Sequence, residues 1–256
     1  MGSFLRRVAV ATTVVCVAVA AGACGDDDGT PIPATRSLQT TSMPISAPDG
    51  AASPQSSAPA ATAYQPALVH VNGNRGSTRF DADLPQVRGG RDDVRDRFND
   101  GMRIAFDDII SSYVATTVGD GSLLGDERSR VTTITDGVVA GVLILNTYSD
   151  GAAHPNNHVA TITIDAEDAR PIRLTDVFTD PAAAAAVLAQ AVTRIDSRVD
   201  YVAPEVNTFL NWVPLAEGFH TYVPVAHALG DWLPVTVPWD DITDLLRPGM
   251  ADRLGG

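Results

Sequence analysis

The sequence contains very little cysteine: only Cys16 and Cys24, both close to the N-terminus. A disulfide, a thiol nucleophile and a cysteine-ligated metal are therefore excluded from everything that follows. A domain without disulfides must be held together by its hydrophobic core, which a folded region of roughly 190 residues can supply.

Lysine is absent, so all 18 basic residues are arginine, against 31 Asp and Glu. From Gln65 onward the balance is 15 Arg to 27 Asp and Glu, a formal charge of −12. Such a surface repels phosphate groups, which disfavours nucleic acid as a partner and direct adhesion to an anionic membrane. The acidity is consistent either with simple solubility or with attraction of a basic partner.

Long apolar runs are also missing, since residues 8–19 form a stretch shorter than the roughly 20 residues of a membrane-spanning helix. Arg6 and Arg7 precede this stretch, and small residues follow it up to Cys24. The arrangement is typical of a bacterial lipoprotein signal peptide over residues 1–23, although a lipobox usually has Leu where Ala21 stands.

We therefore expect Cys24 to carry the lipid that anchors the chain to the extracytoplasmic face of the cell membrane. An ordinary cleaved signal peptide and an uncleaved anchor are the alternatives. All three place the rest of the chain outside the cytoplasm.

Residues 24–65 begin with an acidic triplet and continue with Pro, Ala, Ser and Thr and hardly any large apolar residue. A segment of this composition cannot bury enough apolar surface to order itself. We predict a flexible tether with a root-mean-square reach of about 35 Å. The folded domain then comprises an N-terminal part, 66–130, and a C-terminal part, 131–250.

The N-terminal part opens with a predicted strand over residues 67–71, followed by an expected turn at Asn72-Gly73 and a second strand near residues 78–82. After Gly89-Gly90, apolar residues recur at helical spacing. The apolar positions of this predicted long helix are Val94, Phe98, Met102, Ala105, Phe106, Ile109 and Tyr113.

In the C-terminal part, strands are predicted over 131–134, 138–148 and 159–164, the first two joined at Asp136-Gly137. Asp180 as N-cap and Pro181 at the first helical position predict the start of a second helix.

Further on, Ala216-Glu217-Gly218 is the expected turn of an aromatic hairpin. A short last helix is expected over residues 239–246, ended by Pro248-Gly249. Strands and helices without regular βαβ alternation favour an α+β fold with a mainly antiparallel sheet, covered by two longer helices and a short C-terminal helix.

Two stretches of the C-terminal part carry a resemblance. Residues 148–155 read Tyr-Ser-Asp-Gly-Ala-Ala-His-Pro, and residues 171–178 read Pro-Ile-Arg-Leu-Thr-Asp-Val-Phe. With the aromatic hairpin over 209–222 and the closing segment 235–246, they resemble the RsiV-like C-terminal domain family in the same order. The family includes the extracellular domain of the anti-sigma factor RsiV and a mycobacterial secreted immunogenic antigen.

The resemblance implies a compact α+β domain of the bacterial cell surface that acts as a sensor or binding module and has no catalytic centre. This chain departs from the pattern at Ala152-Ala153, where relatives commonly have two glycines, and over 224–230, which lacks the Tyr-rich run of the lysozyme-sensing members. Lysozyme binding is therefore not carried over.

A serine esterase acting on lipid esters is the alternative function. Ser149, Asp150 and His154 could be imagined as a local triad, but three members within one turn have difficulty forming the required relay, and the Gly-x-Ser-x-Gly pattern is absent. His154 and His158 have a spacing that suits zinc on a helix. The Pro155-Asn156-Asn157 sequence between them favours a turn, so no metal site is predicted.

Aromatic residues are the remaining candidates for function. Trp212, Tyr222 and Trp232, with His154, could line an apolar groove for a ligand; core packing is the alternative interpretation. Taken together, the sequence predicts an exported, lipid-anchored envelope protein with a non-enzymatic binding or sensing domain and no cofactor. Its expected partner is either a basic envelope protein or a small apolar ligand.

Overall fold

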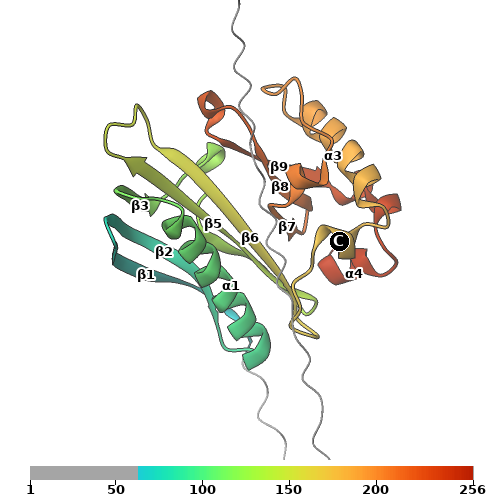
Figure 1. Cartoon of the computed structure of the whole chain (residues 1–256). Coiled ribbons are helices and arrows are strands. Elements are labelled where there is room, and N and C mark those ends of the chain that lie inside the picture. Colours follow the sequence, from blue (N-terminus) through green and yellow to red (C-terminus); the bar gives the residue numbers. More distant parts are fainter. Residues whose placement is uncertain (1–62, 256) are drawn as a thin grey trace, which may run out of the picture. The chain divides into compact units, whose positions relative to one another are not determined.

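The computed structural model describes residues 63–255 (Figure 1). The predicted signal peptide over 1–23, the lipidation site Cys24 and the tether as far as residue 62 lie outside the described residues. The described residues all belong to one compact unit. No helix within residues 63–255 has the length and apolar character needed to cross a membrane.

The larger sheet has six strands and is antiparallel except for the pairing of β2 with β3. The strands run in the order β1-β2-β3-β5-β4, and β6 pairs with β5. Their bounds are β1 (Gln65–Arg75), β2 (Thr78–Arg88), β3 (Thr116–Asp120), β4 (Arg130–Ile134), β5 (Val138–Ser149) and β6 (Asn156–Asp165).

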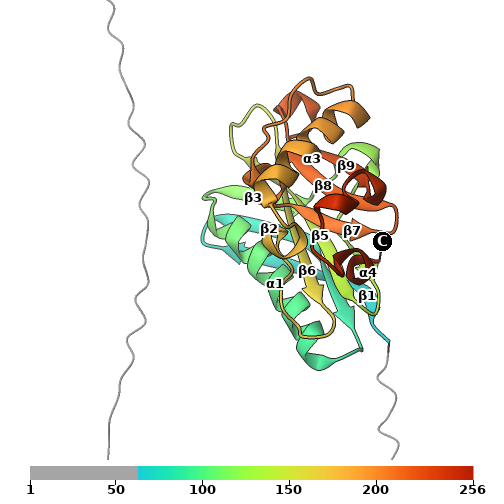
Figure 2. The same ribbon diagram turned by 90° about the vertical axis from the view of Figure 1, so that its right-hand side faces the viewer.

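The smaller sheet is an antiparallel meander of β7 (Trp212–Leu215), β8 (Gly218–Pro224) and β9 (Trp232–Pro238). Helix α1 (Asp92–Ser111) packs on the larger sheet, and α3 (Pro181–Ile195) packs beside β9 (Figures 1 and 2). Two short helices, α2 (Leu174–Val177) and α4 (Met250–Leu254), complete the described α-helices.

Strand β5 is buried on both faces, which explains its nearly continuous apolar sequence. Val139, Leu143 and Leu145 belong to the core under α1. The alternate residues Val142 and Ile144 belong to a second core, which Val213 and Tyr222 of the smaller sheet complete. The order of layers is therefore α1, larger sheet, smaller sheet and α3.

The two longer helices form as predicted. Val94, Phe98 and Met102 are fully buried on the sheet-facing side of α1, as their spacing requires. The Asp180 carboxylate accepts hydrogen bonds from the backbone N–H groups of Ala182 and Ala183, with Pro181 at the first helical position. The predicted α+β class, with its mainly antiparallel sheet, two longer helices and short C-terminal helix, is confirmed.

The turn expected at Asn72-Gly73 is wrong. β1 continues to Arg75, and the turn consists of Gly76 and Ser77. Gly73 pairs with Phe80 across the hairpin, where a Cβ would lie 2.9 Å from Cζ of the Phe80 ring. Glycine stands there because the ring covers its backbone, not because the chain reverses.

The position expected for the C-terminal helix is also wrong. Residues 239–246 form two 3-10 turns, Trp239–Asp241 and Thr243–Leu245, separated by Ile242 with a non-helical backbone. Helix α4 instead begins after Gly249, whose φ of 81° lies in the left-handed region that glycine tolerates. The Pro-Gly pair thus precedes the helix.

Glu127, in the connection between β3 and β4, ties the larger sheet to β8. Its Oε1 accepts a hydrogen bond of 2.9 Å from the Tyr222 hydroxyl and lies 3.2 Å from Nε2 of His220. Its other oxygen pairs with Arg130. Burial raises the pKa of Glu127, but the interactions with His220, Arg130 and Tyr222 outweigh burial and lower it to about 2.

We expect Glu127→Gln to lower the free energy of unfolding by about 2 to 3 kcal/mol at neutral pH, because the ionised carboxylate is stabilised only in the folded state. The folded-state pKa lies below the ordinary value of 4.5, so this contribution is present above that pH and is lost as the pH falls toward about 2. Urea unfolding of the wild type and Glu127→Gln between neutral pH and acid measures the difference in their free energies of unfolding.

The matched control is Glu217→Gln, because Glu217 lies exposed in the β7–β8 turn. Its effect on unfolding should stay within about 0.5 kcal/mol. The free energies of unfolding of Glu127→Gln and the wild type should become more similar as the pH falls. If their difference stays constant in acid, the lowered pKa of Glu127 is contradicted.

Candidate functional site

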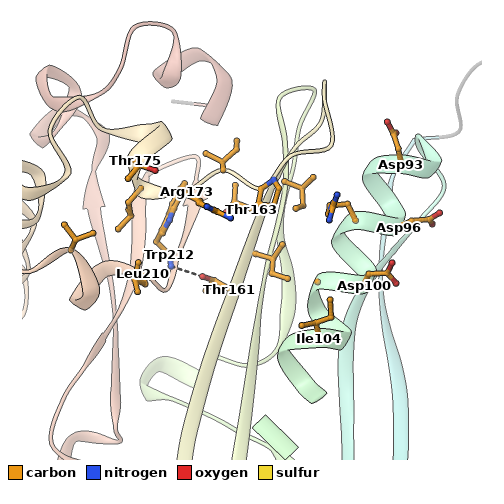
Figure 3. Close-up of a pocket in the computed structure, with 18 residues that line it drawn as sticks. Asp93, Asp96, Asp100, Ile104, Thr161, Thr163, Arg173, Thr175, Leu210 and Trp212 are labelled. Atoms are coloured by element: carbon orange, nitrogen blue, oxygen red, sulfur yellow. Dashed lines mark hydrogen bonds between the residues drawn. The ribbon is translucent and has the colours of Figure 1, made fainter. Parts of the chain in front are cut away.

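A cleft lies along β6, between α1 on one side and the chain around α2 and the start of β7 on the other (Figure 3). We call it the α1–β6 cleft. Its volume is about 870 Å³, within the range of small-molecule sites. The lining residues are Asp93, Asp96, Arg97, Asp100, Gly101 and Ile104 of α1, residues 161–164 of β6, and Pro171, Ile172, Arg173, Leu174, Thr175, Val206, Leu210 and Trp212 of the opposite wall.

Both walls of the cleft are held to β6. A Cβ at Gly101 would lie 2.5 Å from Cδ1 of Ile162, so glycine lets α1 approach the strand closely. On the other side, the backbone N–H of Trp212 donates a 3.0 Å hydrogen bond to the Thr161 hydroxyl. The backbone N–H of Ile172 donates one of 2.9 Å to the Thr163 carbonyl. The cleft is therefore formed by the fold itself.

Large apolar side chains stand exposed on both walls. Ile104 of α1 is 60% exposed and Leu210 is 57% exposed. Between them, Trp212 is almost buried and stacks on Phe219 with ring centroids 4.9 Å apart. A ligand that covers these groups removes apolar surface from water, which is favourable at about 25 cal/mol per Å².

The charged residues of the cleft fall into two groups. Asp93 pairs with Arg91 at 2.6 Å and Asp96 with Arg95 at 2.8 Å. The hydrogen bond from Arg91 lowers the pKa of Asp93, against an opposing effect of desolvation.

The remaining charged groups of the cleft are Asp100, Arg97 and Arg173, and none of them forms a salt bridge within residues 63–255. In Figure 3, Asp96 and Asp100 extend from the side of α1 turned away from β6, whereas Arg173 lies on the opposite wall of the cleft.

The three aromatic residues singled out from the sequence do not share one cavity. Trp212 lines the cleft. Tyr222 is fully buried between the two sheets, donating to Glu127, and Trp232 packs in the same core while its indole N–H donates to the Asn157 carbonyl at 3.0 Å. Only Trp212 is therefore placed to contact a ligand in the α1–β6 cleft.

His154 lies in the connection between β5 and β6. Its ring stacks on His227, with centroids 3.5 Å apart and an interplanar angle of 16°. Nδ1 of His227 lies 2.8 Å from a carboxylate oxygen of Asp231, whose other oxygen accepts the Asn157 N–H at 2.8 Å. The stack joins this connection to the segment ahead of β9, away from the α1–β6 cleft.

The residues of the imagined triad face different partners. The Ser149 hydroxyl lies 2.9 Å from the Thr116 hydroxyl. His154 contacts His227 and, through Nδ1, the Pro155 carbonyl at 3.3 Å. Among the described residues no hydrogen bond joins Ser149 to His154, so this region does not display the relay that a serine nucleophile requires.

His158 is separate from His154. It lies in β6, where Nε2 is 3.0 Å from the Tyr113 hydroxyl and 2.9 Å from that of Thr147. Burial lowers the pKa of His158, and the charge of Asp231 opposes this effect. Over the part of the chain that the structure describes, no group of three or more His, Cys, Asp or Glu side chains is arranged to hold a metal ion.

Several cleft residues are not singled out by the sequence patterns, among them Arg97, Ile104 and Leu210. Ile104 offered a signal, since it falls outside the buried stripe of α1 and is an apolar residue among charged neighbours. Arg173 belongs to the stretch 171–178 noted above, but nothing in the sequence indicates that this stretch faces α1. Leu210 gave no signal of its own.

No protein-family model matches the sequence, and no curated protein matches it. Solved structures do match. One is the crystal structure of a DUF3298 family member from Bacteroides fragilis NCTC 9343, with 14% identity and a TM-score of 0.50 over 74% of this chain and 95% of that one. Another is a DUF3298 family protein from Pseudomonas aeruginosa PAO1, with 12% identity and a TM-score of 0.48 over 73% of this chain and 95% of that one.

The structural neighbours are thus DUF3298 family proteins, a family of domains of unknown function. At this level of identity, the likeness to the Bacteroides protein shows a common fold. It leaves the α1–β6 cleft of this chain to be interpreted from its own residues.

We expect Ser149→Ala to leave hydrolysis of a short-chain p-nitrophenyl ester unchanged, because the Ser149 hydroxyl faces Thr116 and not His154. Loss of that hydrogen bond should lower the free energy of unfolding by about 1 kcal/mol. Ester turnover and thermal unfolding of the variant, beside His154→Ala, measure both effects. Ester turnover that disappears in Ser149→Ala while the fold persists would restore the esterase.

Proposed function

We propose that this chain is an exported, lipid-anchored cell-envelope protein whose folded domain binds a small apolar ligand in the α1–β6 cleft. The observation that carries the proposal is the exposure of Ile104 and Leu210 on opposite walls of one cleft. Apolar side chains gathered at a concave site are typical of ligand binding, whereas singly scattered ones are not.

The placement in the envelope rests on sequence outside the described residues. The basic start, the apolar stretch 8–19 and the small residues before Cys24 support export and lipidation. A diacylglycerol with a further acyl chain supplies more than one buried chain, as stable anchoring requires. The tether over residues 24–65 would let the domain reach away from the membrane surface.

Membership of the RsiV-like family is part of the same proposal. Its support is the ordered set of stretches 148–155, 171–178, 209–222 and 235–246, together with the fold shared with a DUF3298 family member. Arg173, Leu174 and Thr175 of the second stretch line the cleft. A binding module therefore agrees with both the resemblance and the geometry.

Of the two partner classes that the sequence allows, the small apolar ligand is favoured by the cleft. The formal charge of −12 over the folded part supports a basic envelope protein as a partner elsewhere on the surface. No described feature localises such a partner, whereas the apolar ligand has a site of suitable volume.

We expect Ile104→Asp and Leu210→Asp each to weaken binding of the neutral fluorophore N-phenyl-1-naphthylamine by about tenfold, since each removes an apolar wall contact and adds a charge. Both side chains are more than half exposed, so stability should change by less than about 0.5 kcal/mol. Fluorescence titration and thermal unfolding of the chain from residue 24 onward, carrying Cys24→Ser, provide the measurements.

The matched control for the cleft variants is Val114→Asp, because Val114 is an apolar residue that is 81% exposed and lies outside the cleft. It should bind the fluorophore like the wild type. Equal binding by all variants, or no binding by the wild type, would overturn the cleft as an apolar ligand site.

We expect Cys24→Ser to move the protein from the membrane fraction to the soluble extracytoplasmic fraction and to abolish incorporation of a palmitate analogue. Cys16→Ser is the matched control, since Cys16 lies within the predicted signal peptide and should leave both unchanged. Fractionation and metabolic labelling of the full-length chain measure this. Palmitate incorporation that persists in Cys24→Ser would contradict lipidation at this residue.

A further inference from the structure

We infer that the ligand of the α1–β6 cleft is an amphiphile with a single apolar tail and an anionic head group, which Arg97 and Arg173 bind. The inference rests on the proposed function and adds the chemical class of the ligand to it. Three features of the cleft carry it: the apolar walls, two guanidinium groups without salt bridges, and the orientation of Asp96 and Asp100 away from β6.

The tail is assigned to the apolar part of the cleft. Ile104 and Leu210 supply exposed apolar surface on the two walls, and Ile162 and Trp212 lie between them. Gly101 keeps α1 close to Ile162, so this wall of the cleft is held directly against β6. A single extended chain covers such a strip of surface without needing a deep cavity.

The head group is assigned to Arg97 and Arg173, which enter from opposite sides of the cleft. Arg97 lies on α1, and Arg173 lies directly before α2. Neither guanidinium forms a salt bridge within residues 63–255. Most other arginines of the described chain do pair with a carboxylate. Guanidinium groups bind carboxylate and phosphate with two parallel hydrogen bonds, so both remain available to an anion.

The aspartates of α1 do not cancel the preference of Arg97 and Arg173 for an anionic head group. Asp93 pairs with Arg91, and Asp96 shares Arg95 with Asp92. Asp100 forms no salt bridge within residues 63–255, and Figure 3 shows the side chains of Asp96 and Asp100 on the side of α1 turned away from β6. The positive charges of Arg97 and Arg173 therefore face the cleft while these carboxylates point away from β6, which favours an anion although the folded part as a whole is acidic.

Thr163 offers a further polar contact on the β6 side. It is 5% exposed, lines the cleft and has a hydroxyl without a hydrogen-bond partner among the described residues. A buried hydroxyl without a partner is unfavourable, so a hydrogen bond from a ligand would be favoured at this position.

The test compares ligands that share one tail and differ in the head group: laurate, dodecyl phosphate, dodecanol and dodecylammonium, each below its micelle concentration. Isothermal titration calorimetry uses the chain from residue 24 onward, carrying Cys24→Ser. We expect the two anions to bind about tenfold more tightly than dodecanol, and dodecylammonium to bind most weakly. High salt should reduce the difference.

Arg97→Gln and Arg173→Gln should each weaken laurate binding by about three- to tenfold while leaving dodecanol binding within about twofold of the wild type. Arg103→Gln is the matched control, because Arg103 is an exposed residue of the same helix that does not line the cleft. It should alter neither affinity. Ile104→Asp, by contrast, should weaken binding of laurate and dodecanol alike.

The outcomes separate this inference from the proposed function. Equal affinities for laurate, dodecanol and dodecylammonium would overturn the anionic head group and leave an apolar ligand site intact. Tightest binding of dodecylammonium would also overturn it and would assign the head group to Asp100. Absence of binding by all four compounds and by the neutral fluorophore would overturn both.

Discussion

The burial of β5 on both faces is the constraint on which the rest of the structure depends. Its residues alternate between the core under α1 and the core shared with the smaller sheet. A strand with two apolar faces cannot remain at a surface, so it requires a layer on each side. α1 supplies one layer and β7–β9 supply the other, and β6, paired along β5, is carried into the space between α1 and the smaller sheet.

The α1–β6 cleft is a consequence of this arrangement. α1 crosses β6 at Gly101, while the chain around α2 and β7 is hydrogen-bonded to β6 through Thr161 and Thr163. Two elements that both attach to one strand, but not to each other, leave a groove between them. The apolar residues on its walls, Ile104 and Leu210, are exposed because neither wall has the other to pack against.

Charge has different roles at Glu127 and along α1. At Glu127 the carboxylate is nearly buried and its pKa is lowered to about 2 by His220, Arg130 and Tyr222, so the charge contributes to holding the two sheets together. On α1, Asp93 and Asp96 are exposed and paired with neighbouring arginines, where an ion pair contributes little to stability. Their effect there is to determine which charges of the cleft remain free.

Local patterns in the sequence were sufficient for the fold class. The helical spacing from Val94 to Phe106, the cap at Asp180-Pro181 and the apolar run of β5 each correspond to an element of the structure. They were insufficient at Gly73 and Gly249, because glycine is not found only in turns. Gly73 makes room for the Phe80 ring on the paired strand, and Gly249 adopts the left-handed backbone that precedes α4. The export signal and Cys24 likewise remain predictions from the sequence.

The sequence by itself therefore determined the elements and their apolar faces, since both follow from residues that are neighbours along the chain. Only the tertiary structure decided which residues share a site. Arg97 and Arg173 are far apart in sequence and line one cleft because β6 lies between their elements. Trp212 is close in sequence to Tyr222 and Trp232 but packs in a different core from theirs. The position of a residue along a strand predicts the face of the sheet on which it lies. Which other residues it contacts depends on the layer that packs against that face.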